Sequence, residues 1–156
     1  MNSAHLHIVL NHFPIIGTFI ALMVAAVAIV TKQAVIKRLV LGMMVLIAVT
    51  GAAAYFTGLA TEEDFFGPGS PALEQVERHE ASARVTWIVG LVAGAVGIGG
   101  LLMSRRVTDV PMPIMAAAVV ALLVSAFFFM RTSNLGGQIM HPEIRSDPAS
   151  KMFAPD

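Results

Sequence analysis

Four long stretches without a charged residue alternate with short polar segments along the chain. The stretches cover residues 6–31, 39–61, 85–104 and 110–130. Each is close to the ~20 apolar residues with which an α-helix crosses about 30 Å of hydrocarbon. The pattern therefore predicts an all-α fold, a four-helix transmembrane bundle with helices at about 4–31, 37–58, 72–104 and 111–131.

Proline and glycine refine the ends of these helices. Pro14 removes an amide inside the first helix, so we expect either a kink there or a helix that starts near Phe13 with Asn11 as its N-cap. Gly58 is a natural C-cap for the second helix, before a polar extramembrane loop. We expect residues 1–131 to form the transmembrane domain. The polar residues 132–156 form a C-terminal tail that folds over the mouth of the bundle.

The two shortest loops predict the orientation. Residues 32–38 carry three cations, and residues 105–109 carry two cations and one acid. Dense Lys and Arg in short loops favour the cytoplasmic side. The sequence therefore predicts an N-out/C-out protein of the bacterial inner membrane. Its longer segments, with nine of the ten acids, would then face the periplasm.

Composition agrees with a membrane protein and excludes several kinds of site. The chain of 156 residues is 56% hydrophobic and 13% charged, with a mean hydropathy of +0.78. It has no cysteine, which excludes disulfides, cysteine-ligated clusters and thioether-linked haem. A net charge of zero without a basic stripe argues against nucleic-acid binding. No nucleotide-binding loop or nucleophile elbow is present.

Small residues on the third helix predict a close neighbour. Gly90 and Gly94 form a GxxxG pair, and Gly97 follows one turn later. Such residues let a second helix approach closely. A flat cofactor against the same glycines is the less common alternative.

All five histidines fall on the predicted outer side. His12 at the start of the first helix and His79 at the start of the third lie at matching depth. Imidazoles on facing helices hold haem b in membrane bundles, so we expect His12 and His79 to be axial ligands. Arg84, with Arg78 and Arg131, lies where haem propionates would emerge. His7 with His141 could form a second site.

A bare metal centre is the alternative site. A mixed imidazole and carboxylate shell for Zn, Fe or Cu would draw on three histidines and three glutamates. These are His12, His79, His141, Glu63, Glu80 and Glu143. Ten methionines invite a copper hypothesis, but most lie in the spans as apolar filler. Each histidine could also serve simply as an anchor at the membrane interface.

Four short motifs carry a resemblance to a known group of proteins. They are residues 10–17 (LNHFPIIG), 57–63 (TGLATEE), 79–83 (HEASA) and 136–144 (GGQIMHPEI). With them the chain resembles uncharacterised four-helix bacterial membrane proteins, relatives of the domain-of-unknown-function families grouped with the two-haem b-type cytochromes. The resemblance implies that His12, His79 and His141 are site residues, with Glu63, Glu80 and Glu143 beside them. The chain differs from the two-haem cytochromes in having no histidine in the middle of a span, so any haem should lie near the outer face.

Two functions follow from these observations. The first is a small b-type cytochrome-like subunit that transfers electrons near the periplasmic face, as part of a homo-oligomer or larger membrane complex and with a periplasmic cytochrome as a possible partner. Because two imidazole ligands leave no open position on the iron, we expect this subunit to carry electrons and not to catalyse a reaction itself. The second is a haem-free accessory subunit whose histidines are structural or bind a metal ion.

Overall fold

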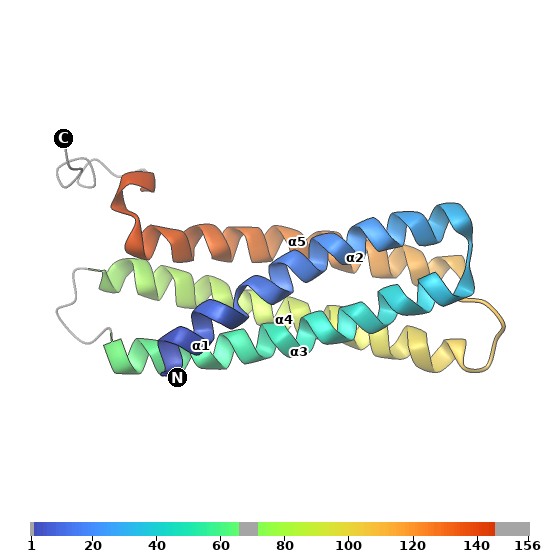
Figure 1. Cartoon of the computed structure of the whole chain (residues 1–156), viewed down its shortest axis with the longest axis horizontal. Helices are drawn as coiled ribbons and strands as arrows, with labels where there is room; N and C mark the ends of the chain where they lie inside the picture. Colours follow the sequence, from blue (N-terminus) through green and yellow to red (C-terminus); the bar gives the residue numbers. More distant parts are fainter. Residues whose placement is uncertain (1, 66–71, 146–156) are drawn as a thin grey trace.

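The computed structural model describes the backbone of residues 2–65 and 72–145, and the side chains of 2–62 and 72–145. Its helices run nearly parallel along one long axis (Figure 1). They are α1 (Ser3–Leu10), α2 (His12–Thr31), α3 (Ala34–Phe65), α4 (Leu73–Ser104), α5 (Met112–Met140) and the 3₁₀ turn η1 (Pro142–Ile144). With α1 and α2 counted as one span, four helices are long and apolar enough to cross a membrane. The predicted four-helix bundle is confirmed.

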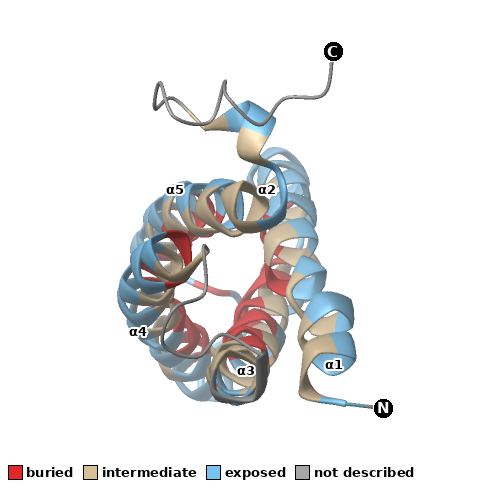
Figure 2. Ribbon diagram, turned by 90° about the vertical axis from the view of Figure 1, so that its left-hand side faces the viewer, coloured by how far each residue is buried: buried red, intermediate tan, exposed pale blue. Residues whose placement is uncertain are grey.

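The helices form a closed ring in the order α2, α3, α4 and α5 (Figure 2). Helix α3 packs between α2 and α4, and α5 packs between α4 and α2. Within the described residues, α1 packs on α3 and α2 and does not reach α5. The span formed by α1 and α2 therefore lies diagonally opposite α4.

Two matching stripes of small and polar residues face the centre of this bundle. In both spans the residues recur at alternating steps of four and three, which keeps them on one helical face. The first stripe is His7, Asn11, Pro14, Thr18, Ala21, Ala25 and Ala28. The second lies 72 positions later and is His79, Ala83, Thr86, Gly90, Ala93, Gly97 and Gly100. In both stripes the last five residues are buried.

Two glycines of α4, Gly94 and Gly97, bring it against α3. A Cβ atom on Gly97 would stand 2.7 Å from the carbonyl oxygen of Leu41, and one on Gly94 would stand 2.5 Å from the Cβ of Ala48. No side chain fits in either position. The GxxxG pattern thus serves helix packing, as the sequence favoured: Gly94 contacts α3, and a Cβ on Gly90 would lie 3.7 Å from Phe129 of α5.

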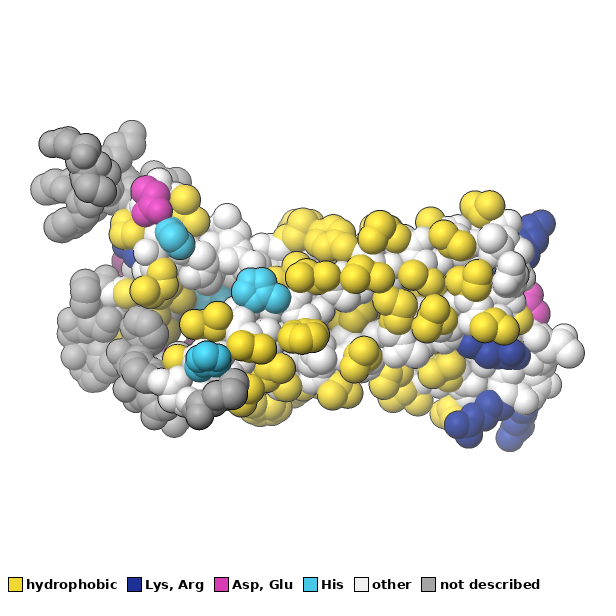
Figure 3. Space-filling model, in the orientation of Figure 1, with side chains coloured by type: hydrophobic (Ala, Val, Ile, Leu, Met, Phe, Trp, Pro, Cys, Tyr) yellow, Lys and Arg dark blue, Asp and Glu magenta, His cyan; other side chains and the backbone are white. Residues whose placement is uncertain are grey.

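The two ends of the bundle differ in chemistry, while the long side in view is largely apolar (Figure 3). Lysines and arginines gather at the end with the two short turns, and histidines gather at the other. At the basic end, the ammonium of Lys37 is 2.7 Å from Asp109 Oδ2 and 3.3 Å from the Val110 carbonyl oxygen. Arg38 donates to the carbonyl oxygens of Ser104, Val107 and Thr108. Helix α3 thereby holds the turn that joins α4 to α5.

Two helix ends differ from the prediction. Helix α3 continues past Gly58 to Phe65, and α5 continues through Gly136 and Gly137 to Met140. Gly58 is therefore not a C-cap: a Cβ on it would lie 3.0 Å from the ring of His7, and the glycine makes room for that ring. Residues 132–140, the first nine assigned to the tail, belong to α5, and Gly136 within them makes room for the ring of His79.

The first span is interrupted at Asn11, as the proline suggested. Helix α1 ends at Leu10 and α2 begins at His12, with Pro14 in the first turn of α2. Asn11 occupies the N-cap position but its side chain makes no capping hydrogen bond. The missing amide of Pro14 removes a bond of the helical ladder, so α1 can change direction there and lean on α3.

Candidate cofactor site at the histidine end

His7 and His79 are held in the same way on opposite sides of the bundle. The Nδ1 atom of His7 is 2.8 Å from the carbonyl oxygen of Ala54, and Nδ1 of His79 is 3.0 Å from that of Thr132. A carbonyl oxygen only accepts, so Nδ1 carries the proton in both rings. The other ring nitrogen, Nε2, keeps its lone pair, which is the form in which histidine binds a metal.

A glycine on the following helix gives each ring its place. A Cβ on Gly58 would lie 3.0 Å from Cε1 and 3.2 Å from Nδ1 of His7. A Cβ on Gly136 would meet the same two atoms of His79 at the same distances. Both glycines stand four positions after the residue whose carbonyl accepts from the ring. The hairpin formed by α1, α2 and α3 and the hairpin formed by α4 and α5 therefore repeat one arrangement of histidine, carbonyl and glycine.

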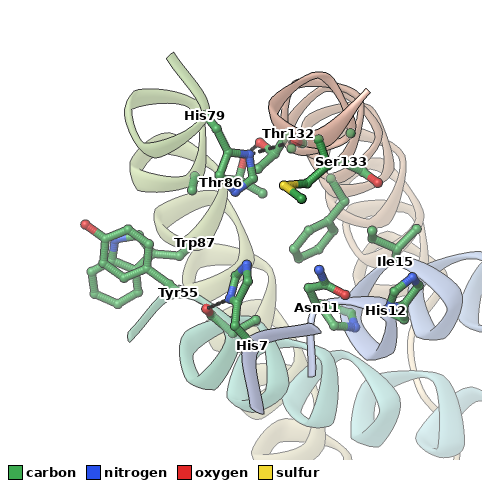
Figure 4. A pocket seen from close by; sticks show the side chains of 18 of the residues that line it. His7, Asn11, His12, Ile15, Tyr55, His79, Thr86, Trp87, Thr132 and Ser133 are labelled. Carbon is green, nitrogen blue, oxygen red and sulfur yellow. Dashed lines mark hydrogen bonds between the residues drawn. The ribbon is translucent and has the colours of Figure 1, made fainter. Parts of the chain in front are cut away.

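The two rings point toward one another across the bundle (Figure 4). Their centroids are 6.4 Å apart and their planes are inclined by 77°. A metal bound between the Nε2 atoms of two opposed imidazoles, at bonds of about 2.0 Å, separates the ring centres by about 6.3 Å. The observed centroid separation of 6.4 Å is close to that value.

Open space lies on two sides of the facing rings. The larger cavity has a volume of about 360 Å³ and the smaller one about 60 Å³. Four residues line both cavities: His7, Tyr55, His79 and Ala83. The larger one is within the range of ligand sites, about 300 to 1,000 Å³. A flat group centred between the rings would have room on either side of them.

Hydroxyl groups fix the α5 side of the site. Thr132 Oγ1 is 2.7 Å from both Ser82 Oγ and Thr86 Oγ1. The Thr86 hydroxyl also lies 2.8 Å from the Ser82 carbonyl oxygen. Because the carbonyl of Thr132 is the acceptor for His79, this network holds the residue that orients the ring.

Asn11 presents an unmatched polar atom in the wall of the larger cavity. Its Oδ1 is buried and has no hydrogen-bond partner among the described residues, and the side chain lies beside the cavity (Figure 4). A buried polar atom without a partner costs free energy, so such atoms generally meet a ligand or water. Together with the facing rings, Asn11 fits a cavity that holds a bound group.

The structure places His12 elsewhere than the sequence predicted. His79 faces His7, and His12 lies beyond Asn11, away from the facing rings (Figure 4). The Nδ1 of His12 is 3.0 Å from the Ile8 carbonyl oxygen of the preceding helical turn, and the side chain is exposed. His12 still lines the larger cavity, at its outer part. The structure therefore does not bring His12 and His79 together as a facing pair, and the ring opposite His79 is that of His7.

His141 also lines the larger cavity, but it does not pair with His7. Its Nδ1 is 2.9 Å from Glu143 Oε1, and both side chains are exposed. A backbone hydrogen bond and this contact with His141 hold the pKa of Glu143 below its usual range. The tail was predicted to cover the mouth of the bundle, and of its described residues His141 lies there. Residues 146–156 lie outside the described part.

Arg84 does not reach the cavity. Its guanidinium is 2.7 Å from Glu80 Oε1 on the exposed surface of α4, and it lines neither cavity. Beside it the rings of Tyr55 and Trp87 stack at 5.3 Å and close the cavity between α3 and α4. Arg78 and Arg131 are exposed and do not line it either. The arginines expected near propionates are thus not placed there.

The predicted mixed metal shell is not assembled in the described part of the chain. There, no three histidine, aspartate or glutamate side chains gather closely enough to hold a metal ion. Glu80 is paired with Arg84, and Glu143 with His141. The side chain of Glu63 lies outside the described residues, so its predicted role stays a prediction.

His7 was predicted to pair with His141, although the sequence contains a signal that places His7 opposite His79. It begins the stripe of small and polar residues that ends at Ala28, with spacings of four and three. His79 begins the equivalent stripe of α4, whereas His12 lies one position outside the first stripe. Aligning the two stripes pairs His7 with His79.

Comparison of the chain with protein families, curated proteins and solved structures found no match.

Proposed function

We propose that this chain is a small b-type cytochrome of the membrane, in which His7 and His79 are the axial ligands of one haem. The observation that carries the proposal is the pair of opposed rings, 6.4 Å apart, each with Nδ1 bonded to a carbonyl oxygen. Both Nε2 lone pairs are thereby available to one metal between them. Haem bound there would supply a one-electron change of its iron.

The residues favour electron transfer over catalysis. With two imidazoles on one iron, no position remains for a substrate, so the protein would pass electrons without carrying out a reaction of its own. Both rings are fixed by backbone acceptors and by close contact with Gly58 and Gly136. Such fixed ligands suit electron transfer, because little has to move when the charge of the metal changes.

The wider setting belongs to the same proposal. On the predicted orientation the histidine end faces the periplasm of a bacterium, where a soluble cytochrome would exchange electrons with the site. The apolar surface seen in Figure 3 would face lipid, other copies of the chain or a larger complex.

Absorption spectroscopy tests this function directly. We expect the protein, purified in mild detergent, to show a Soret band and, after dithionite, the sharp α and β bands of low-spin haem b. His7→Ala and His79→Ala should each abolish that spectrum, because one imidazole alone does not give low-spin bis-histidine iron. His5→Ala is the matched control, since His5 is exposed on the same helix and does not line the cavity.

A single metal ion is the second candidate for the same pair of rings. Two imidazoles suit Zn, Cu and Fe, and the ring separation fits a bare ion as well as haem iron. Elemental analysis of the purified protein separates the cases. A colourless protein that holds one equivalent of metal, and loses it in His7→Ala, would show that the rings bind a metal ion and not haem. A colourless, metal-free protein would leave a structural accessory subunit.

A further inference from the structure

The larger cavity has a distinct mouth on the side away from α3 and α4. Three exposed residues line its outer part: His12 at the start of α2, and Met140 and His141 at the end of α5. Helix α1 packs on α3 and leaves α5 uncovered here, so the mouth lies between the start of α2 and the end of α5. Ser133 adds a hydroxyl on the α5 side (Figure 4).

The opposite side of the facing rings is unsuited to an anion. The small cavity there is about 60 Å³ and is lined by two carboxylates, Glu62 and Glu80. Arg84, one helical turn after Glu80 on α4, is already paired with Glu80. With two carboxylates in its lining, this cavity suits a further carboxylate less well than the larger cavity, whose lining has none among the described residues.

The mouth carries the opposite chemistry. The Nδ1 atoms of His12 and His141 each donate to an acceptor, the Ile8 carbonyl and the Glu143 carboxylate respectively. These contacts leave Nε2 of both rings for a second partner. With one ring nitrogen engaged, a histidine can still form a hydrogen bond with a carboxyl group through the other.

We infer that the mouth of the larger cavity binds the two carboxylate side groups of the cofactor, with His12 and His141 as positioning residues. This inference rests on the proposed haem site, because haem b carries two propionates on one edge of its ring. The propionate edge would lie at the mouth between α2 and α5, and the apolar edge toward Tyr55 and Trp87. The two histidines thus do not ligate iron but fix which edge of the ring faces outward.

Esterified haem tests the inference on the unmodified protein. The full-length chain, produced without haem and held in lipid nanodiscs, is titrated with haem b or with its dimethyl ester, in which both carboxylates are capped. We expect the ester to bind about tenfold to a hundredfold more weakly, since the hydrogen bonds to the two carboxylates are lost. The low-spin spectrum should be the same for both, because His7 and His79 remain the ligands.

The double variant His12→Gln/His141→Gln identifies the residues responsible. We expect it to bind haem b about as weakly as the unmodified protein binds the ester, and to bind both forms alike. His5→Gln, an exposed histidine away from the cavity, should keep the full preference. Circular dichroism confirms that the helices are intact.

The outcomes separate this inference from the function on which it rests. Equal binding of haem and ester by the unmodified protein, with a low-spin spectrum, overturns the role of the mouth and leaves the ligands in place. A preference that survives in the double variant overturns the assignment to His12 and His141. Failure of both forms to give a low-spin spectrum overturns the haem site itself.

Discussion

A common proton position unites the histidines that line the large cavity. His7, His12 and His79 donate from Nδ1 to backbone carbonyl oxygens, and His141 donates to a carboxylate. Each contact fixes the tautomer and the angle of its ring, as the outer partners of metal-bound histidines do. What differs is depth: His7 and His79 are half-buried and face each other, whereas His12 and His141 are exposed.

Gly58 and Gly136 should be as important to the site as the histidines themselves. An added methyl group at either position would lie 3.0 Å from a ring carbon and push the ring away from its partner. We predict that Gly58→Ala and Gly136→Ala each weaken cofactor binding at least tenfold, equivalent to about 1.4 kcal/mol, while the helices remain. Titration at the Soret band measures the affinity.

Gly42 and Gly99 provide the controls for this prediction. They lie in the same two pairs of helices, on α3 and α4, and a Cβ on either would meet nothing within 4 Å. Alanine there should leave cofactor binding unchanged and slightly favour the helix. If Gly58→Ala binds the cofactor as Gly42→Ala does, the close contact with His7 does not shape the site.

The histidine pair expected from sequence and the pair that face each other in the structure differ at one position, for a definable reason. His12 stands beside Pro14 in the most distinctive motif of the chain, and depth in the membrane alone cannot distinguish it from His7. The distinguishing property is the helical face. A rotation of one residue about the helix turns a side chain by about 100°, which separates His12 from the stripe that includes His7, Asn11 and Pro14.

At the scale of elements, two basic side chains on α3 hold the turn between α4 and α5. Lys37 is 2% exposed, and its ammonium binds Asp109 and the carbonyl oxygen of Val110. Arg38 binds three further carbonyl oxygens of the same turn. From sequence these residues indicated only orientation. Their contacts show that they also close the bundle at the end opposite the histidines.

The contact between Lys37 and Asp109 makes a defined contribution to stability against acid. The hydrogen bond from Lys37 is the main cause that lowers the pKa of Asp109. A carboxyl whose pKa is lowered on folding stabilises the fold above its unfolded pKa, about 3.9, and the contribution is lost as the pH falls through the lower native value. Asp109→Asn should therefore reduce the melting temperature by roughly 2 to 6 °C at pH 7, with the difference from the wild type shrinking below about pH 4.

Thermal unfolding followed by circular dichroism between pH 3 and 7 measures this effect. Glu77→Gln, at an exposed carboxylate of α4, is the control and should melt as the wild type does at every pH. A loss in Asp109→Asn that stays the same from pH 7 to pH 3 would show that the ionised carboxylate is not the stabilising form.

Element boundaries show where local rules stop being sufficient. Thr57-Gly58 and Gly136-Gly137 have the local character of helix ends, yet α3 and α5 pass through both. The reason is tertiary: each glycine accommodates a histidine ring from another helix, which no rule on a single segment contains. The four apolar spans, in contrast, follow from hydropathy and length alone, and the structure confirms them.

At the scale of the whole molecule, two hairpins of the same design place one histidine each at the same end. The hairpin of α1, α2 and α3 supplies His7 with its acceptor Ala54, and that of α4 and α5 supplies His79 with its acceptor Thr132. Below the rings, stripes of alanine and glycine draw the spans together (Figure 2). The bundle is thus tightly packed toward the basic end and hollow at the histidine end.

The orientation of this asymmetric bundle decides which compartment the site serves. Of the cations at the basic end, Lys32, Arg105 and Arg106 are exposed. Such dense charge in short turns favours retention in the cytoplasm, so the histidine end should face the periplasm. We predict that alkaline phosphatase fused after residue 156 is active and that the same enzyme inserted at Thr108 is inactive. Fusions to a fluorescent protein that folds only in the cytoplasm should give the reverse pattern. An active insertion at Thr108 with an inactive C-terminal fusion would place the site on the cytoplasmic side, and its electron partner with it.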